Sequence, residues 1–334
     1  MMKDRLPITI LTGFLGSGKT TVLNKLVQHE SFQDTAILIN EFGEVGLDHL
    51  LVSPLEDEEI VLLNAGCLCC TIRTDLIATL NNLWEKRSIG EIPLFKRVLI
   101  ETTGLADPAP ILHTLLTEED ISENFCIDGI VATVDALNAQ GLLTKFSESV
   151  KQVAVADRLL VTKGDLVSRK CVDDLVRRLK LINQHATILR TSHGDVDPHK
   201  LLGIGTSAHD VFLSKNREER SHGHNHGVHD DRVMTFHLKA SIPIALHRFV
   251  AWIEKLLGKE GEKLLRLKGL LCVEGVAQPV VVHGVQHVFH PLSYLTVWPD
   301  DRRISRIVVI GYALCEDTIR GTFEREVLDE INGE

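Results

Sequence analysis

The sequence predicts an α/β protein: a doubly wound domain with a mostly parallel sheet, followed by a second, smaller α+β domain. Three observations support this prediction. The first two hundred residues alternate short apolar segments with amphipathic ones. Val98–Ile100 and Leu159–Val161 are apolar at every position, as is typical of strands buried on both faces of a sheet. Residues 216–231 then read NREERSHGHNHGVHDD, a polar stretch without an apolar period, so the character of the chain changes there.

The predicted elements of the first domain follow the chain in order. Apolar segments are predicted as strands at Ile8–Thr12, Thr35–Asn40, Ile60–Leu63, Arg97–Glu101, Gly129–Val134, Arg158–Thr162 and Thr187–Leu189. Helices are expected at Lys19–Glu30, at Thr71–Lys86 with Thr71 as the N-cap, and after Ala106-Asp107-Pro108. Because strands and helices alternate, the sheet should be parallel and doubly wound.

The second domain has a different order of elements. Strands are predicted at Val233–Lys239, Leu264–Val273, Pro279–His283 and Ile304–Ile310, and helices at Ile244–Leu257 and Glu316–Ile331. Several strands with helices at the ends favour a largely antiparallel sheet. We place the first domain at residues 1–212, a His-rich linker at 213–231 and the second domain at 232–334.

The composition disfavours several classes of protein. The chain of 334 residues is long enough for about two domains, and its formal net charge of −10 disfavours nucleic acids and membranes as partners. Met1–Arg5 leads into a short strand, unlike a signal peptide, and no apolar run reaches the length of a membrane span. Seven unevenly spaced cysteines do not resemble a disulfide framework, which favours the cytoplasm. Four isolated cysteines are predicted to be packing residues: Cys126, Cys171, Cys272 and Cys315.

A phosphate-binding loop is predicted between the first strand and the first helix. The segment GFLGSGKT matches the G-x-x-x-x-G-K-[ST] pattern in the required strand–loop–helix context. Glycines let backbone N–H groups face phosphate oxygens, and the helix N-terminus adds partial positive charge. Lys19 would reach the β- and γ-phosphates, and Thr20 would ligate Mg²⁺. The residues expected to bind the nucleotide here are Gly13, Gly16, Ser17, Gly18, Lys19, Thr20 and Thr21.

Two further segments that follow strands fit the same site. Glu101 ends a buried strand and would hold Mg²⁺ through water, while the amide of Gly104 would approach the γ-phosphate. Catalysis would rest on positioning and on charge stabilisation by Lys19, with Thr20 and Glu101 holding the metal.

The segment Thr162-Lys163-Gly164-Asp165 is expected to determine which nucleotide base the site binds. Asp165 can accept two hydrogen bonds from guanine, a pair of donors that adenine lacks, and the stem of Lys163 can lie over the base. The motif usually begins with Asn, so Thr162 weakens this interpretation. The loop Thr191–Gly194 follows the next strand and could close over the base.

A dense thiol cluster, Cys67-Leu68-Cys69-Cys70, lies between the third predicted strand and the helix predicted at Thr71–Lys86. Thiolates bind zinc and other soft or borderline metals. Three thiolates cannot complete a four-ligand structural site, so Glu41, His113 or water would fill the remaining position. A redox switch remains an alternative. The His-x-His-x-His run of the linker offers auxiliary metal ligands, namely His222, His224 and His226.

The carboxyl ends of parallel strands meet at one edge of a sheet, where ligands bind. The phosphate loop, Glu41, the thiol cluster and Glu101 each follow a predicted strand. The thiols are therefore expected near the γ-phosphate, and hydrolysis could disorder the loop that carries Glu41.

The ordered motifs GFLGSGKTT, NEFGEVGLD, NAGCLCCTIRTDL, ETTGLADP and TKGD resemble the CobW-like family of metal-chaperone P-loop GTPases, relatives of the urease and hydrogenase nickel accessory GTPases. The resemblance extends to the second domain through Leu265–Gly269 and Trp298-Pro299. It implies GTP hydrolysis with Mg²⁺, and binding of Zn²⁺, or of Co²⁺ or Ni²⁺, at Cys67, Cys69 and Cys70. It also implies delivery of the metal to a client metalloprotein or a metal-cofactor biosynthesis enzyme.

Two other functions remain open from the sequence. One is a GTP-regulated metal or redox sensor, and the other is an ATP-dependent kinase or synthetase. A homodimer is compatible with either of them and with a metallochaperone.

Overall fold

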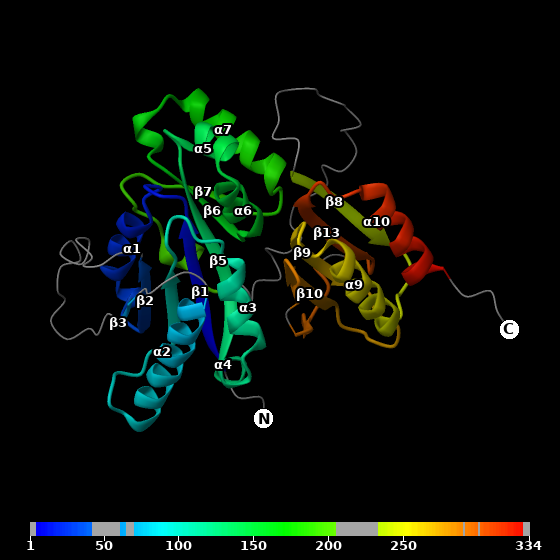
Figure 1. The fold of residues 1–334 in the computed structure, drawn as a ribbon, viewed down its shortest axis with the longest axis horizontal. Helices are drawn as coiled ribbons and strands as arrows, with labels where there is room; N and C mark the ends of the chain where they lie inside the picture. The colour runs from blue at the N-terminus through cyan, green and yellow to red at the C-terminus, as the bar shows by residue number, and fades with distance from the viewer. Residues whose placement is uncertain are drawn as a thin grey trace. The chain divides into compact units, whose positions relative to one another are not determined.

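The computed structural model describes residues 5–41, 61–64, 70–204, 233–289, 291–299 and 301–329. These residues form two compact units (Figure 1). The first unit contains the residues up to Lys180 and those from Ala186 to 204, and the second contains Leu181–His185 and the residues from 233 onward. The predicted boundaries near residues 212 and 231 fall outside the described ranges, so they stay predictions.

The first unit is built on a seven-stranded sheet in the order β3-β2-β4-β1-β5-β6-β7. Every described pairing in it is parallel, which confirms the doubly wound α/β prediction. The strands are β1 (Leu6–Gly13), β2 (Thr35–Glu41), β3 (Val61–Asn64), β4 (Arg97–Glu101), β5 (Phe125–Asp135), β6 (Arg158–Thr162) and β7 (Thr187–Arg190). Since β1 lies between β4 and β5, the loop that follows it stands where the strand order reverses, the place where such sheets bind ligands.

The helices of this part of the chain connect the strands. They are α1 (Lys19–Val27), α2 (Cys70–Ile89), α3 (Ala109–Thr117), α4 (Glu119–Asn124), α5 (Ala139–Lys145), α6 (Ser147–Val155) and α7 (Arg169–Ile182). Several boundaries differ from the prediction. Helix α1 ends at Val27, and a separate 3₁₀ turn follows at Glu30–Phe32. Because α2 begins at Cys70, Thr71 lies inside the helix and is not its N-cap. Strand β5 begins at Phe125, four residues before the predicted start.

Helix α1 is anchored by its apolar face. Val22, Leu23 and Leu26 are at most 2% exposed and belong to one core cluster with Leu11 of β1 and Leu160 of β6. Full burial of a side chain of this size stabilises a fold by about 1.5–3 kcal/mol. Both ends of the phosphate loop are therefore held by the core.

The second unit is built on a six-stranded sheet of long and short strands. The strand order is β11-β10-β9-β13-β8, and β12 pairs with β10. They are β8 (Val233–Ala240), β9 (Leu264–Leu271), β10 (Val280–Val285), β11 (Val288–Phe289), β12 (Ser293–Tyr294) and β13 (Ser305–Tyr312). All the described pairings between these strands are antiparallel, which confirms the α+β prediction.

Two helices pack on the core of this second sheet. They are α9 (Leu246–Glu260) and α10 (Glu316–Phe323), and their Phe249, Trp252 and Phe323 join the strands in one buried cluster. The predicted helix through Ile331 was wrong in extent, because a π-helical turn follows α10 at Glu324–Leu328 and Asp329 is extended. Among the residues described in the two units, no helix is both long and apolar enough to cross a membrane.

Candidate nucleotide site

The phosphate loop joins β1 to α1 through glycines in conformations that other residues rarely adopt. Gly13, Gly16 and Gly18 have φ angles of 141°, 70° and 91°. Gly13 also lies against β5, where a Cβ atom would stand 2.2 Å from Thr133 Oγ1. A side chain at position 13 is therefore excluded by both geometry and space. The structure thus gives a physical reason for the first glycine of the motif.

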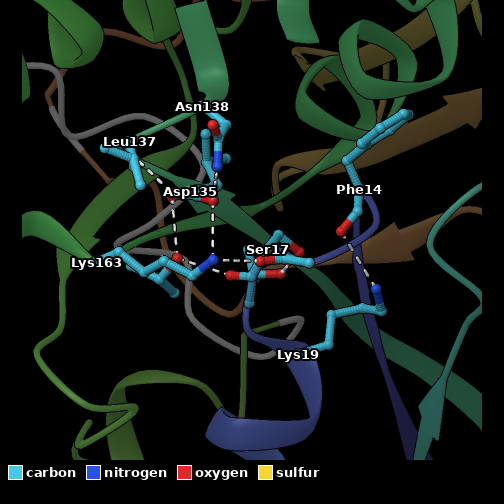
Figure 2. Close-up of polar contacts among 11 residues, drawn as sticks. Phe14, Ser17, Lys19, Asp135, Leu137, Asn138 and Lys163 are labelled. Atoms are coloured by element: carbon cyan, nitrogen blue, oxygen red, sulfur yellow. Dashed lines mark hydrogen bonds and ion pairs between the residues drawn. The ribbon is translucent and has the colours of Figure 1, made fainter. Parts of the chain in front are cut away.

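Lys19 turns back over the loop that precedes it. Its side chain is buried, and Nζ donates to Gly13 O at 2.9 Å and to Phe14 O at 3.4 Å (Figure 2). Ser17 Oγ lies 2.6 Å from Thr133 Oγ1 and is also buried. The loop therefore combines a buried ammonium with the N-terminus of α1, and both features suit phosphate.

Thr20 and Glu101 are brought together as the sequence predicts. Thr20 Oγ1 donates to Glu101 Oε1 at 3.2 Å. Glu101 ends β4 beside Leu11 of β1 and is only 5% exposed. A hydroxyl and a carboxylate converging at the end of a phosphate loop are the kinds of oxygen that Mg²⁺ takes beside a nucleotide. These two residues could hold Mg²⁺, one directly and one through water.

The segment after β4 lies directly on the phosphate loop. A Cβ atom on Gly104 would stand 2.7 Å from both the N and the Cα of Leu15. The close approach expected at Gly104 therefore exists, but in the structure its partner is the backbone of Leu15; contact with a γ-phosphate stays a prediction. From α6, the buried Gln152 donates through Nε2 to Gly104 O at 3.2 Å and to Ala106 O at 3.0 Å.

The segment expected to bind the base, Thr162–Asp165 (the base segment), is also joined to the phosphate loop. Thr162 Oγ1 donates to Ser17 O at 2.7 Å, and Lys163 Nζ donates to Gly16 O at 2.7 Å. The threonine in place of the usual Asn thus has a clear structural role. Asp165 lies beside the loop after β7: Ser192 Oγ donates to its Oδ1 at 3.4 Å, and His193 Nδ1 is 4.0 Å from its Oδ2.

Sequence reasoning missed Asp135, which ends β5 and lies in this site. Its Oδ2 accepts from Lys163 Nζ at 2.9 Å (Figure 2). Burial alone would raise the pKa of Asp135, but hydrogen bonds from Lys163, Asn138 and the Leu137 amide outweigh it and lower the pKa below its ordinary value. An acid closing an apolar strand, VATVD, is the same signal that identified Glu101 in VLIE, so the sequence did contain a clue.

Most of the predicted metal ligands lie outside the described side chains. Cys67 and Cys69, and His222, His224 and His226, fall outside the described ranges, while Cys70 and Glu41 are placed by their backbone alone. Cys70 begins α2, Glu41 ends β2, and β2 lies next to β4. His113 is half-buried on α3, with Nδ1 3.3 Å from Thr117 Oγ1. In the described part of the chain, no group of three or more His, Cys, Asp or Glu side chains is arranged so that it could hold a metal ion, so the thiol site remains a prediction.

The isolated cysteines differ from one another. Cys272 is buried and Cys126 is half-buried, whereas Cys171 and Cys315 are exposed, so the packing prediction was wrong for the last two.

Two family models match this chain. Residues 7–190 match the model described as CobW/HypB/UreG, nucleotide-binding domain, and residues 233–327 match the cobalamin synthesis protein cobW C-terminal domain.

The chain is also similar to individual proteins over most of its length. The zinc chaperone YjiA of Escherichia coli strain K12 is 32% identical over 317 residues, 95% of this chain and 97% of that protein. The zinc-regulated GTPase metalloprotein activator 1 of Schizosaccharomyces pombe is 33% identical over 200 residues, 58% of this chain and 47% of that protein. The crystal structure of zinc-bound YjiA GTPase from E. coli has a TM-score of 0.71 at 28% identity, covering 97% of this chain and 99% of that one.

Proposed function

We propose, because this chain belongs to the CobW/HypB/UreG family, that it is a GTP-hydrolysing metallochaperone. It binds GTP with Mg²⁺ in the first unit, carries zinc on Cys67, Cys69 and Cys70, and passes the metal to a client protein. The relatives named as zinc chaperone and as zinc-regulated GTPase support this function.

The contact between Thr20 and Glu101 is the observation that carries the nucleotide half of the proposal. It joins the first turn of α1 to the end of β4 across 3.2 Å, beside a buried lysine. Thr20 and Glu101 would hold Mg²⁺ there, and the metal would supply positive charge to offset the negative charge that develops on the phosphates during hydrolysis. Phosphate contacts through Thr21 and Gly104 belong to the same proposal.

The metal half of the proposal follows from the order of neighbouring strands. β3, β2 and β4 are adjacent and parallel, so the chain leaves each of them at the same edge of the sheet. Glu41 ends β2 at this edge, and Glu101 ends β4 there. In the sequence, Cys67 and Cys69 lie between β3 and α2, and Cys70 is the first residue of α2. We infer that Glu41 adds a carboxylate ligand and that His113 is the less favoured alternative. Zinc is the first choice of metal, with Co²⁺ or Ni²⁺ as substitutes on the same thiolates.

The affinity for zinc in two nucleotide states tests this coupling. We expect the full chain with Mg²⁺ and a non-hydrolysable GTP analogue to bind zinc with a different Kd from the chain with GDP, since only the former holds a γ-phosphate. Competition with a chromogenic chelator measures both values. Cys69→Ala should abolish the difference, while Cys126→Ala, on β5, should preserve it. Equal affinities in the two states would remove the chaperone mechanism and leave a plain GTPase.

Competition between nucleotides separates the proposal from an ATP-dependent kinase or synthetase. If Asp165 recognises guanine, GDP should displace a fluorescent GDP analogue at a far lower concentration than ADP does. Asp165→Ala should reduce the difference between these two concentrations. Tighter binding of ADP would refute the assignment of the base segment.

The remaining features of the proposal are its client and its setting. The client is a metalloprotein or an enzyme of metal-cofactor synthesis, and the His-rich segment scavenges metal for the thiol site. We place the protein in the cytoplasm, because the four cysteines with described side chains are free thiols. A homodimer is tested by sedimentation with GDP and with the GTP analogue.

A further inference from the structure

We propose that Asp135 is a positioning residue of the nucleotide site. It holds Lys163 against the phosphate loop, so that the segment expected to bind the base, Thr162–Asp165, is already joined to the phosphate loop before nucleotide binds. This inference rests on the proposed nucleotide site. It concerns a residue to which neither the loop motif nor the base motif assigns a role.

The carboxylate of Asp135 is almost inaccessible, with a side chain that is 2% exposed. Its Oδ1 accepts from the Leu137 amide at 2.8 Å, and its Oδ2 accepts from Asn138 Nδ2 at 2.8 Å and from Lys163 Nζ at 2.9 Å (Figure 2). A buried carboxylate is tolerated only when it is paired and hydrogen-bonded. The two neutral donors fix the orientation of the carboxylate, and Lys163 supplies the opposite charge.

The ammonium of Lys163 has a second partner in the phosphate loop. Nζ also donates to Gly16 O at 2.7 Å, so one ammonium connects the end of β5 to the loop before α1. The backbone of Lys163 is left-handed, with φ 55° and ψ 24°, a conformation that is unfavourable for a residue with a side chain. A strained backbone conformation persists where surrounding contacts hold it in place. Here, the hydrogen bonds from Lys163 Nζ to Gly16 O and to Asp135 Oδ2 provide such contacts.

The pairing of β5 with β6 places Asp135 beside Thr162, the residue that precedes Lys163. Asp135 pairs with Thr162 in the parallel register of β5 and β6, and the Ala136 amide donates to Thr162 O at 2.9 Å. Thr162 and Lys163 then each donate to one carbonyl of the phosphate loop, Ser17 O and Gly16 O. Without the carboxylate, the lysine would keep only the carbonyl contact, and its partly exposed stem would be free to leave the position where it can lie over a base.

A purely structural role for Asp135 is the competing explanation, and a double-mutant cycle separates the two. The variants are Asp135→Asn, Lys163→Met and the double substitution, with Asp128→Asn as a matched control. Asp128 is another buried aspartate of β5; it accepts from Thr9 Oγ1 at 3.1 Å and from the Gly203 amide at 2.8 Å. Fluorescent GDP titration gives Kd, and thermal unfolding reports stability.

We expect Asp135→Asn and Lys163→Met each to weaken GDP binding about tenfold, the size of one charge-assisted hydrogen bond. The double variant should be no weaker than the worse single variant, because both substitutions break the same bridge. Asp128→Asn should lower the unfolding temperature while Kd stays within about twofold of wild type. An additive double variant, or unchanged binding by Asp135→Asn, would overturn the proposal.

An experiment without nucleotide tests the positioning role of Asp135 independently of the proposed nucleotide binding. Amide hydrogen exchange of the full chain should accelerate in residues 15–18 and 163–166 in Asp135→Asn, and in Lys163→Met if the first variant does not fold. It should not change in those segments in Asp128→Asn. Unchanged exchange in the variants of the bridge would refute the positioning role, whatever the protein binds. Failure of wild type to bind GDP, with the exchange result intact, would refute only the nucleotide assignment.

Discussion

At the scale of single residues, we expect the contact between Thr20 and Glu101 to determine how strongly the site binds Mg²⁺. Glu101→Gln keeps the size of the side chain and removes its charge. Because Glu101 is expected to hold the metal through water, the Mg²⁺ concentration for half-maximal GTP hydrolysis should rise about 10–100-fold. Binding of GDP without Mg²⁺ should be unaffected. A Mg²⁺ requirement equal to that of wild type would show that the carboxylate serves the fold alone.

Another single residue, Cys315, should react at unusually low pH. It is exposed at the N-cap of α10, and hydrogen bonds from the Thr318 hydroxyl and amide lower the pKa of its thiol. A lowered pKa means that thiolate forms, and alkylation accelerates, at lower pH than for an ordinary cysteine. Thr318→Val should therefore move the pH midpoint of Cys315 alkylation, followed by mass spectrometry, upward. An unmoved midpoint would remove the hydroxyl as the cause.

At the scale of elements, α6 controls the segment between β4 and α3. Gln152 and Lys151 are consecutive on α6; the first donates to Gly104 O and Ala106 O, and the second pairs with Asp107 at 2.9 Å. Gln152→Leu would leave the carbonyl groups of the buried Gly104 and the half-buried Ala106 without this donor, which costs about 1–3 kcal/mol in the free energy of unfolding. We also expect slower hydrolysis with little change in GDP affinity, because the segment faces the expected γ-phosphate end.

Urea unfolding and single-turnover hydrolysis measure these two effects. Gln33→Leu, at an exposed position after α1, is the matched control and should change neither. If GDP affinity fell as much as hydrolysis did, Gln152 would support the whole loop rather than the γ-phosphate end.

The sequence predicts elements well where their signal is local. The order of β1, the loop and α1 depends on adjacent residues, and it was predicted correctly except for the end of the helix. The link between Asp135 and Lys163 joins residues 28 positions apart, and it depends on the register of β5 and β6, which no local pattern specifies. The end of α10 was missed for a similar reason: its apolar spacing continues, but packing of Phe323 and Val327 in the core accompanies a π-helical turn that propensity does not predict.

At the scale of the whole molecule, each unit has a hydrophobic core of its own. Only the first carries the candidate nucleotide site, so GDP should stabilise that unit selectively. At a GDP concentration 100 times Kd, the gain is about 2.7 kcal/mol. Differential scanning calorimetry should show two transitions, of which GDP with Mg²⁺ raises one. A single transition, or an equal shift of both, would mean that the units unfold as one cooperative structure.

The hydroxyl of Thr162 and the ammonium groups of Lys19 and Lys163 all donate to carbonyls of the loop before α1. A loop held in this way has little conformational entropy left to lose when a ligand arrives. GDP association should therefore be a single kinetic phase whose rate rises linearly with concentration, without a plateau from a slow rearrangement of the loop. We therefore expect the phosphate loop to act as a rigid receptor, and the structural change that depends on the nucleotide to occur near the edge strand β3 and its neighbour β2.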